Sequence, residues 1–466
     1  MGDNHRLSTS EDSNNSITAQ ASHVHVVVAD EERELEAPPA EVSIQIIPSP
    51  TESPVRRRRI HKVPRPLRMN NEHVYDPVVL SLGPYHHGRP QFSQVQEFKA
   101  EILNRFLSDS APKNKGFFYN KILERIDEIR SYYEEESTGE FSDEALAEMI
   151  LLDACFTIYY LQSDYKDYHS LGISIASFMS RDFLMLENQI PMWTIRLLID
   201  LKYGKDKGEA WFCEYLSSMT FGAERLTQIP WDNGDEPLHL LEARRRMILL
   251  GQEKAAESEC IRDLDSRRKE LRQRRSQNRI KMANSQFRSV MDLKTKGVYF
   301  RPSSNCLTDI RFRSYSFYRL LQLPVWYLNN NSMVFFSNMI AFEMSPETDT
   351  DRDVISYVKF MKSLIETPRD VKALREKGIL FSRLGSDEEV VKVFKQIDTF
   401  GADNWDHFLD VKMRIEEHCN SKAKTWMAEL IHAYFLSPWT AIALFAAIIL
   451  LSLTFLQTFY TIHPAN

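Results

Sequence analysis

Helical periodicity of apolar residues is the feature that most constrains the fold of this 466-residue chain. The clearest case begins at Ser142, a favourable N-cap followed by two acidic residues, and continues with apolar side chains at spacings of three and four as far as Tyr159. Similar segments are 98–107, 117–133, 190–203, 210–219, 333–342, 354–366 and 388–400. No regular series of alternating strands accompanies them. The sequence therefore predicts a mainly α fold, with a large helical body of one or two lobes.

Composition excludes several classes of protein. With 43% hydrophobic and 26% charged residues, the chain is neither a collagen-like fibre, nor disordered throughout, nor a polytopic membrane protein. Its net charge of −7 argues against a surface devoted to nucleic acid, which needs a dominant cationic footprint. Only 15 glycines leave little material for phosphate-binding loops.

The cysteines indicate a reducing compartment. Five of them lie far apart and form no C-x-x-C pair, which disfavours both a disulfide framework and a structural zinc site. The N-terminus lacks the apolar stretch of a secretory signal peptide. We therefore expect reduced thiols and no bound metal or cofactor.

Charge divides the chain into regions. Residues 1–55 carry 2 Arg against 10 acidic residues and have little apolar pattern, so a disordered tail is predicted over 1–60. The body is expected over 61–435, with an N-terminal lobe at 61–236, a charged variable helical segment at 237–287 and a C-terminal lobe at 288–435. Two basic patches interrupt this pattern: Arg56, Arg57, Arg58 and Arg59, and then Arg267, Arg268, Arg272, Arg274 and Arg275. A solvated linker and a projecting helix explain them most simply. The alternatives are a contact of the second patch with anionic lipid and a nuclear or nucleic-acid role of the patches.

The C-terminal end predicts a membrane anchor. No Asp, Glu, Lys or Arg follows Glu429, and the apolar run from Trp439 to Tyr460 has the length that crosses a bilayer. These two aromatic residues suit the two membrane interfaces, and Lys422 on the N-terminal flank favours a body that faces the cytosol. We thus expect a tail-anchored protein with a transmembrane helix at 438–460 and the lipid bilayer as a partner; the alternative is a buried core helix.

Motifs for catalysis are scarce. The chain has no G-x-x-x-x-G-K-[ST], no G-x-S-x-G and no H-E-x-x-H, so nucleotide binding, serine hydrolysis and zincin chemistry lose their usual sequence support. The expectation is a protein that is not an enzyme.

Three polar features still stand out against apolar surroundings. His86 and His87 follow a Gly-Pro turn, and adjacent imidazoles could exchange protons, although neighbours on an extended strand point apart and rarely share a metal. Asp153 and Glu187 interrupt apolar runs and could act as acid and base if they converged. Such carboxylates more often cap helices or bond to backbone at a helix junction. The third feature is Phe335–Glu343, whose Asn338 and Glu343 interrupt apolar residues in the same way.

These segments carry a resemblance to a known family. In order along the chain, the matching positions are Gly83, Pro84, Tyr85, His86, His87, Gly88, then Asp153, Cys155, Phe156, then Asp182, Glu187, Asn188, Gln189, Pro191, and finally Asn338, Phe342, Glu343. In this order they resemble the conserved blocks of the plant family called domain of unknown function 247. Gln96, three residues before Lys99, departs from the family's usual Glu.

The resemblance implies a plant, mostly helical, membrane-anchored protein with no established catalytic activity. Some members of that family are implicated in grass self-incompatibility, which makes recognition between cells a function to consider. Our leading hypothesis is an interaction protein that binds other proteins, another copy of itself or a paralogue, and no nucleic acid. The alternatives are a hydrolase-like enzyme that uses Asp153 and Glu187 with His86 or His87, and a nuclear protein that uses the basic patches.

Overall fold

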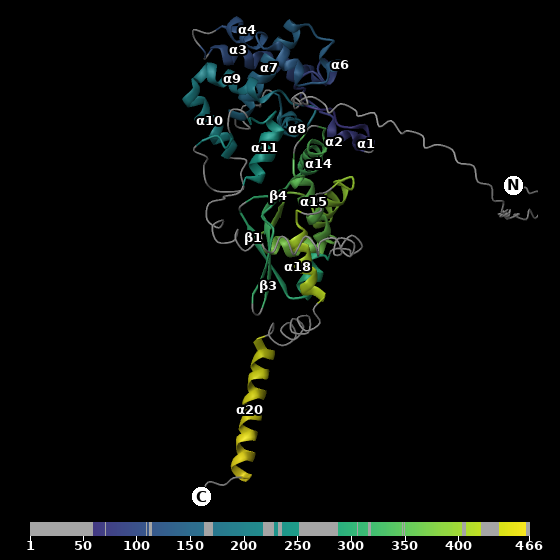
Figure 1. Ribbon diagram of the computed structural model, residues 1–466, viewed down its shortest axis with the longest axis vertical. Coiled ribbons are helices and arrows are strands. Elements are labelled where there is room, and N and C mark those ends of the chain that lie inside the picture. Colours follow the sequence, from purple (N-terminus) through teal and green to yellow (C-terminus); the bar gives the residue numbers. More distant parts are fainter. Residues whose placement is uncertain are drawn as a thin grey trace, which may run out of the picture. The chain divides into compact units, whose positions relative to one another are not determined.

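The computed structural model describes most of the chain, with several gaps (Figure 1). The described residues are 59–69, 71–108, 110, 114–162, 171–217, 228–231, 235–250, 288–304, 306–315, 318–346, 348, 350–402, 407–420 and 438–462. The predicted disordered tail therefore lies outside them except for its last two residues. The basic patches also lie outside, apart from Arg59, as does most of the predicted charged segment.

The first half of the described chain is helical. Its helices are α1 Arg65–Arg68, α2 Glu72–Tyr75, η1 Pro90–Phe92, α3 Ser93–Ser108, α4 Lys115–Leu123, α5 Ile126–Ser131, α6 Glu135–Thr138, α7 Asp143–Gln162, α8 Ile173–Asp182, α9 Met192–Tyr203, α10 Lys205–Ser217 and α11 Leu240–Leu249. Helix α7 packs against α3, α4 and α9 (Figure 1). Its start follows from local chemistry, because the Ser142 hydroxyl accepts a hydrogen bond from the Ala145 N–H at 3.2 Å and two acidic residues occupy the first turn.

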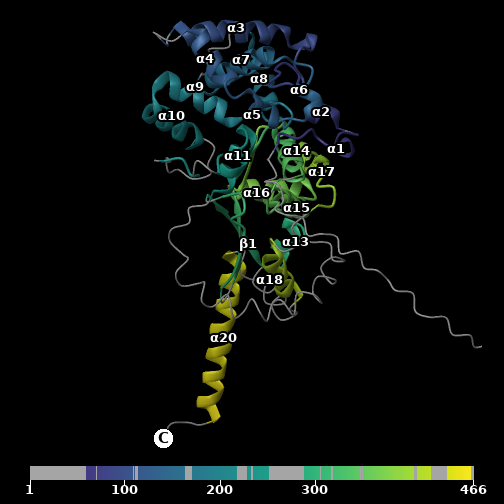
Figure 2. The ribbon, with the colours of Figure 1, turned by 45° about the horizontal axis from the view of Figure 1, so that its top comes forward.

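The second half combines helices with short strands. Its elements are α13 Val290–Thr295, β1 Val298–Ser303, β2 Arg311–Ser314, β3 Arg319–Pro324, β4 Trp326–Leu328, α14 Ser332–Glu343, α15 Asp353–Leu364, α16 Pro368–Glu376, β5 Leu380–Ser382, α17 Asp387–Gln396, α18 Leu409–Asn420 and α20 Pro438–Ile462. One sheet has the order β1-β3-β2, with β1 parallel and β2 antiparallel to β3. A second sheet pairs β4 with β5 in parallel. Helices α14, α15 and α17 pack on one another (Figure 2).

The hydrophobic core forms two clusters that do not follow the chain order. One gathers side chains of α3, α4, α7 and α9. The other gathers the second half of the chain, together with Val74 and Tyr75 of α2 and with Met185 and Leu186. Helix α11, inside the predicted variable segment 237–287, contributes Leu241 to the second cluster and Met247 to the first. Helix α11 therefore contributes to both clusters, and segments 63–75 and 185–186 of the first half pack into the second one. The predicted lobe boundaries stay a prediction.

The mainly helical class is confirmed, but local details differ from the sequence analysis. The segment 117–133, predicted as one helix, is two, because α4 ends at Leu123 and α5 begins only at Ile126. The strands were missed because they are short. In β1, for example, buried and exposed residues alternate only from Val298 to Arg301, and Tyr299 at an exposed position hides that alternation in the sequence.

The prediction of a membrane anchor has to be corrected. A crossing needs about 20 consecutive, predominantly apolar residues. Helix α20 spans Pro438–Ile462, and the hydroxyls of Ser452, Thr454 and Thr458 each donate to a carbonyl one turn earlier at 2.8 Å. The side chains of Trp439 and Tyr460 lie outside the described part.

Among the described residues, no helix has both the length and the apolarity that a membrane crossing requires. The predicted transmembrane helix at 438–460 is therefore wrong. The tail anchor, the lipid bilayer as a partner and the membrane localisation with a cytosol-facing body were inferred from that helix, and they are wrong with it.

Candidate functional site

The polar residues singled out in the sequence meet around the irregular segment 76–89, which joins α2 to η1. Asp182, at the end of α8, is fully buried and accepts hydrogen bonds from three successive backbone N–H groups. Its Oδ2 lies 3.0 Å from the N atom of Val78, 2.8 Å from that of Val79 and 2.9 Å from that of Leu80. Burial raises the pKa of Asp182 to about 6, although these hydrogen bonds act in the opposite direction. One carboxylate thus satisfies the donors of a stretch that has no ladder of its own.

Asn188 and Gln189 continue this role with side-chain amides. Asn188 accepts from the Leu82 N–H at 2.6 Å and donates to the Leu80 carbonyl at 3.0 Å. Gln189 donates to the carbonyls of Phe183 at 3.0 Å and Met185 at 2.8 Å. Its own side-chain oxygen accepts from the Leu241 N–H at 3.1 Å, so Gln189 also connects this block to α11.

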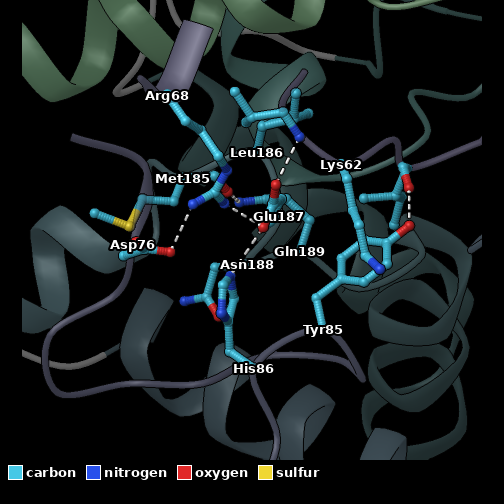
Figure 3. Close-up of polar contacts among 12 residues, drawn as sticks. Lys62, Arg68, Asp76, Tyr85, His86, Met185, Leu186, Glu187, Asn188 and Gln189 are labelled. Atoms are coloured by element: carbon cyan, nitrogen blue, oxygen red, sulfur yellow. Dashed lines mark hydrogen bonds and ion pairs between the residues drawn. The ribbon is translucent and has the colours of Figure 1, made fainter. Parts of the chain in front are cut away.

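Glu187 is the centre of the second group of contacts (Figure 3). Its Oε2 lies 2.5 Å from Nη2 of Arg68 and 3.2 Å from Nε2 of His86, and its Oε1 accepts from the Val63 N–H at 2.6 Å. Burial alone would raise the pKa of Glu187, but the hydrogen bonds from His86 and Arg68 and the charge of Arg68 more than offset it and lower the pKa. Arg68 also binds Asp76 at 2.9 Å. Glu187 therefore holds segment 63–68 against the 182–189 block.

Asp153 of α7 belongs to a different group. Its Oδ1 lies 2.6 Å from Nζ of Lys99, and its Oδ2 accepts from the Gly83 N–H at 2.7 Å. Lys99 also donates to the Ser81 carbonyl and, at 3.1 Å, to Oε1 of Gln96. Gln96, the departure from the family pattern, is thus a partner of the buried ammonium group.

Gly83 is required at its position by both conformation and space. Its φ is +70°, which favours glycine, and a Cβ atom there would lie 2.8 Å from the Gln189 carbonyl and 2.9 Å from the Tyr133 hydroxyl. That hydroxyl donates to the same carbonyl at 3.0 Å. Tyr85 lies edge-on to the Tyr133 ring and donates to the Ile60 carbonyl at 2.5 Å.

The two predicted histidines point to different surroundings. His86 is 2% exposed and reaches Glu187, whereas His87 packs edge-on to the Phe141 ring. The pKa of His87 is lowered, mainly by burial. The charge of Asp153 acts in the opposite direction, and the charge of Lys99 lowers the pKa further. Among the described residues, no group of three or more His, Cys, Asp or Glu side chains could hold a metal ion.

Asn338 and Glu343 of α14 form a counterpart in the second half of the chain. Asn338 accepts from the Leu186 N–H at 2.9 Å and donates to the Val74 carbonyl at 2.9 Å. Glu343 accepts from Nε of Arg245 at 2.7 Å and from the N–H groups of Val354 at 3.1 Å and Ile355 at 2.9 Å. Asn338 thereby binds the same two segments, 63–75 and 185–186, that pack into the second core cluster.

The remaining motif residues are apolar and pack in the core or at its turns. Cys155, Phe156 and Phe342 are buried, and Pro191 is the N-cap of α9. Sequence reasoning did not nominate Lys99 or Arg245, yet a signal was present: Lys99 continues the apolar face of Val95 and Ile102, and Arg245 lies between Leu241 and Ile248 on one face of α11.

The carboxylates are used inside the fold. Glu187 meets His86, while Asp153 binds Lys99 and Gly83, so each has its own set of partners. The alternative in which Asp153 and Glu187 act as acid and base with His86 or His87 stays a prediction. This geometry suits the alternative given in the sequence analysis, in which the carboxylates bond to backbone at helix junctions.

Comparison with known proteins agrees with the resemblance seen in the sequence. A family model described as a plant protein of unknown function matches residues 60–453. The chain belongs to this family, DUF247. It is 25% identical over 438 residues to UPF0481 protein At3g47200 of Arabidopsis thaliana, covering 86% of this chain and 85% of that protein. It is 22% identical over 486 residues to Putative UPF0481 protein At3g02645 of the same plant, covering 86% of this chain and 89% of that protein. No solved structure matches this DUF247 protein.

Proposed function

We propose that this DUF247 protein works by binding other proteins and not by catalysing a reaction. The observation that supports the proposal is the direction in which its motif residues face. Asp153, Asp182 and Glu187 are buried and bond to backbone N–H groups of segment 63–83. A general acid or base has to reach the proton of a substrate, and these carboxylates are instead committed to the fold.

A framework of this kind suits a binding protein. The buried groups fix an irregular segment and two helical regions in one arrangement, and the outer surface can then vary without changing that arrangement. We further propose recognition between plant cells, such as self-incompatibility, as the setting, with another copy or a paralogue as a partner. Support for this setting comes from the family resemblance alone.

Proximity labelling by the full chain fused to a promiscuous biotin ligase tests the binding function. The matched control is the ligase alone, expressed at the same level in the same plant tissue. We expect a reproducible set of proteins enriched over the control, recovered equally by folded Glu187→Gln protein. Two results would contradict the proposal: no protein enriched over the ligase, or turnover of a metabolite by purified protein that is lost in folded Glu187→Gln.

A further inference from the structure

The outward face of the β1-β3-β2 sheet carries aromatic and cationic side chains. In β1, Val298 and Phe300 are buried whereas Tyr299 and Arg301 are exposed. In β2, Phe312 is buried between exposed arginines. Since side chains alternate across a strand, one face of the sheet packs into the core and the other points outward.

Strand register places these outward residues in two rows. Tyr299 pairs with Leu320, which pairs with Arg313. Arg301 pairs with Gln322, which pairs with Arg311. The central strand β3 thus presents the half-buried Leu320 between Tyr299 and Arg313, and the half-buried Gln322 between Arg301 and Arg311.

Two of these arginines carry a charge that no described carboxylate neutralises. Nε of Arg311 lies 2.5 Å from the carboxylate of Asp309, which offsets its charge. Arg301 and Arg313 make no hydrogen bond or ion pair with any described residue, and both are exposed. Segment 298–324 contains four arginines, at 301, 311, 313 and 319, against the single acid at 309.

The aromatic side chains beside this face are held in place. Tyr318 stacks on Tyr315 with ring centroids 4.7 Å apart and meets Tyr299 edge-on at 5.9 Å. Arg319 donates to the carbonyls of Tyr315 and Tyr318, so it closes the turn between β2 and β3. The three tyrosines remain 40 to 51% exposed, and rigid exposed tyrosine and arginine side chains are typical of binding hot spots.

We propose that this face, formed by Tyr299, Arg301, Arg313, Leu320 and Gln322, binds an acidic segment of a partner protein; the proposal rests on the protein-binding function above. Charge complementarity selects the occupant, because two exposed arginines that pair with no described residue attract carboxylates. Stacking between Tyr315 and Tyr318 covers one face of each ring, which leaves fewer ring faces for the bases of a single-stranded nucleic acid.

Geometry also defines the spacing of the acidic groups. Arg301 and Arg313 lie two strands apart and two residues out of register, which is roughly 12 Å for a strand separation of about 4.8 Å and a rise of about 3.3 Å. An extended segment covers that distance in about four residues. The partner segment therefore places acids at positions i and i+4, with an apolar residue at i+2 that meets Leu320.

A fluorescein-labelled peptide with Glu-Thr-Leu-Thr-Glu at its centre is the probe, measured by anisotropy with the full chain. The comparison peptide has Gln in place of both Glu residues, and labelled oligouridine tests for nucleic acid. The variant is Arg301→Glu with Arg313→Glu. Its control is Arg65→Glu with Arg89→Glu, which makes the same charge change at two exposed arginines of the first half of the chain.

We expect the wild type and the control variant to bind the acidic peptide equally, and the sheet variant to bind it at least tenfold more weakly. Affinity should fall as salt rises, because exposed charges are screened. No binding by the wild type, equal binding by the sheet variant, or tighter binding of oligouridine would overturn the proposal. Proximity labelling separates the two claims: partners that persist in the sheet variant overturn this surface only, whereas no enriched partner overturns the binding function.

Discussion

The Nζ atom of Lys99 lies 2.6 Å from Oδ1 of Asp153, and both side chains are only 1% exposed. This ion pair joins α3 to α7, and its second carboxylate oxygen holds the Gly83 N–H. A buried pair of this kind adds little relative to an apolar pair, but it makes each partner indispensable to the other.

Lys99→Met should therefore destabilise the protein by about 3 to 5 kcal/mol, since it leaves the Asp153 charge buried without its partner. The measurement is the free energy of unfolding from denaturant titration. Arg105→Met is the control, because the pair that Arg105 makes with Glu101 is about half exposed on both sides and contributes at most about 1 kcal/mol. Equal losses in the two variants would show that the buried pair has no special role.

Gly83→Ala and Gly88→Ala form a second matched comparison. Both glycines have a positive φ, +70° and +77°, so alanine costs about 1 to 2 kcal/mol at either position. Only at Gly83 would the new Cβ also meet backbone, 2.8 Å from the Gln189 carbonyl, whereas nothing lies within 4 Å at Gly88. Gly83→Ala should thus lower the thermal midpoint clearly more than Gly88→Ala. A larger effect at Gly88 would contradict the described packing.

We expect the stabilisation that ionised Glu187 contributes to be lost in acid. Its pKa is lowered in the folded state by His86 and Arg68 despite burial, so its contribution is present above the ordinary value of 4.5 and is lost as pH falls below it. Thermal midpoints of wild type and Glu187→Gln, measured from pH 7 to pH 3, should converge at the acid end. If the thermal midpoints of the two proteins differed by the same amount at every pH, the ionised Glu187 carboxylate would not be the source of the stabilisation.

For Asp182 we expect the opposite dependence of stability on pH. Burial raises its folded pKa to about 6 from 3.8, so the folded state holds the proton more tightly and ionisation costs stability as pH rises through this window. Relative to Asp182→Asn, the wild type should lose about 2 kcal/mol between pH 4 and pH 6.5. Unfolding titrations at four pH values measure this difference. If the wild type instead gained stability relative to Asp182→Asn as pH rises, the pKa of Asp182 would not be raised in the folded state.

The helices were largely predictable, because long apolar stripes are local signals. The stripe that ends at Tyr159 is found in α7, and the segments 333–342 and 354–366 are found in α14 and α15. The strands were not predictable, because β4 and β5 contain three residues each and exist through pairing with each other. Hydropathy at 439–460 led to the membrane helix, which the described residues do not support.

Candidate residues were found more readily than their roles. Asp153, Glu187 and Asn338 stood out as polar residues within apolar runs, and all three are buried. Their partners were hidden because contacts such as Glu187 with Val63, or Asn338 with Val74, join residues far apart in the sequence. A buried lysine such as Lys99 looks like a surface charge until the opposing carboxylate is known.

Amide hydrogen exchange in segment 78–83 tests the central claim most directly, because the claim is that buried motif side chains hold this irregular segment as part of the fold. The Val79, Leu80, Leu82 and Gly83 N–H groups donate to Asp182, Asn188 and Asp153. We predict exchange as slow as in α7, with faster exchange at residues 78–80 in Asp182→Asn. Exchange of this segment at the rate of an unprotected loop in the wild type would contradict the account.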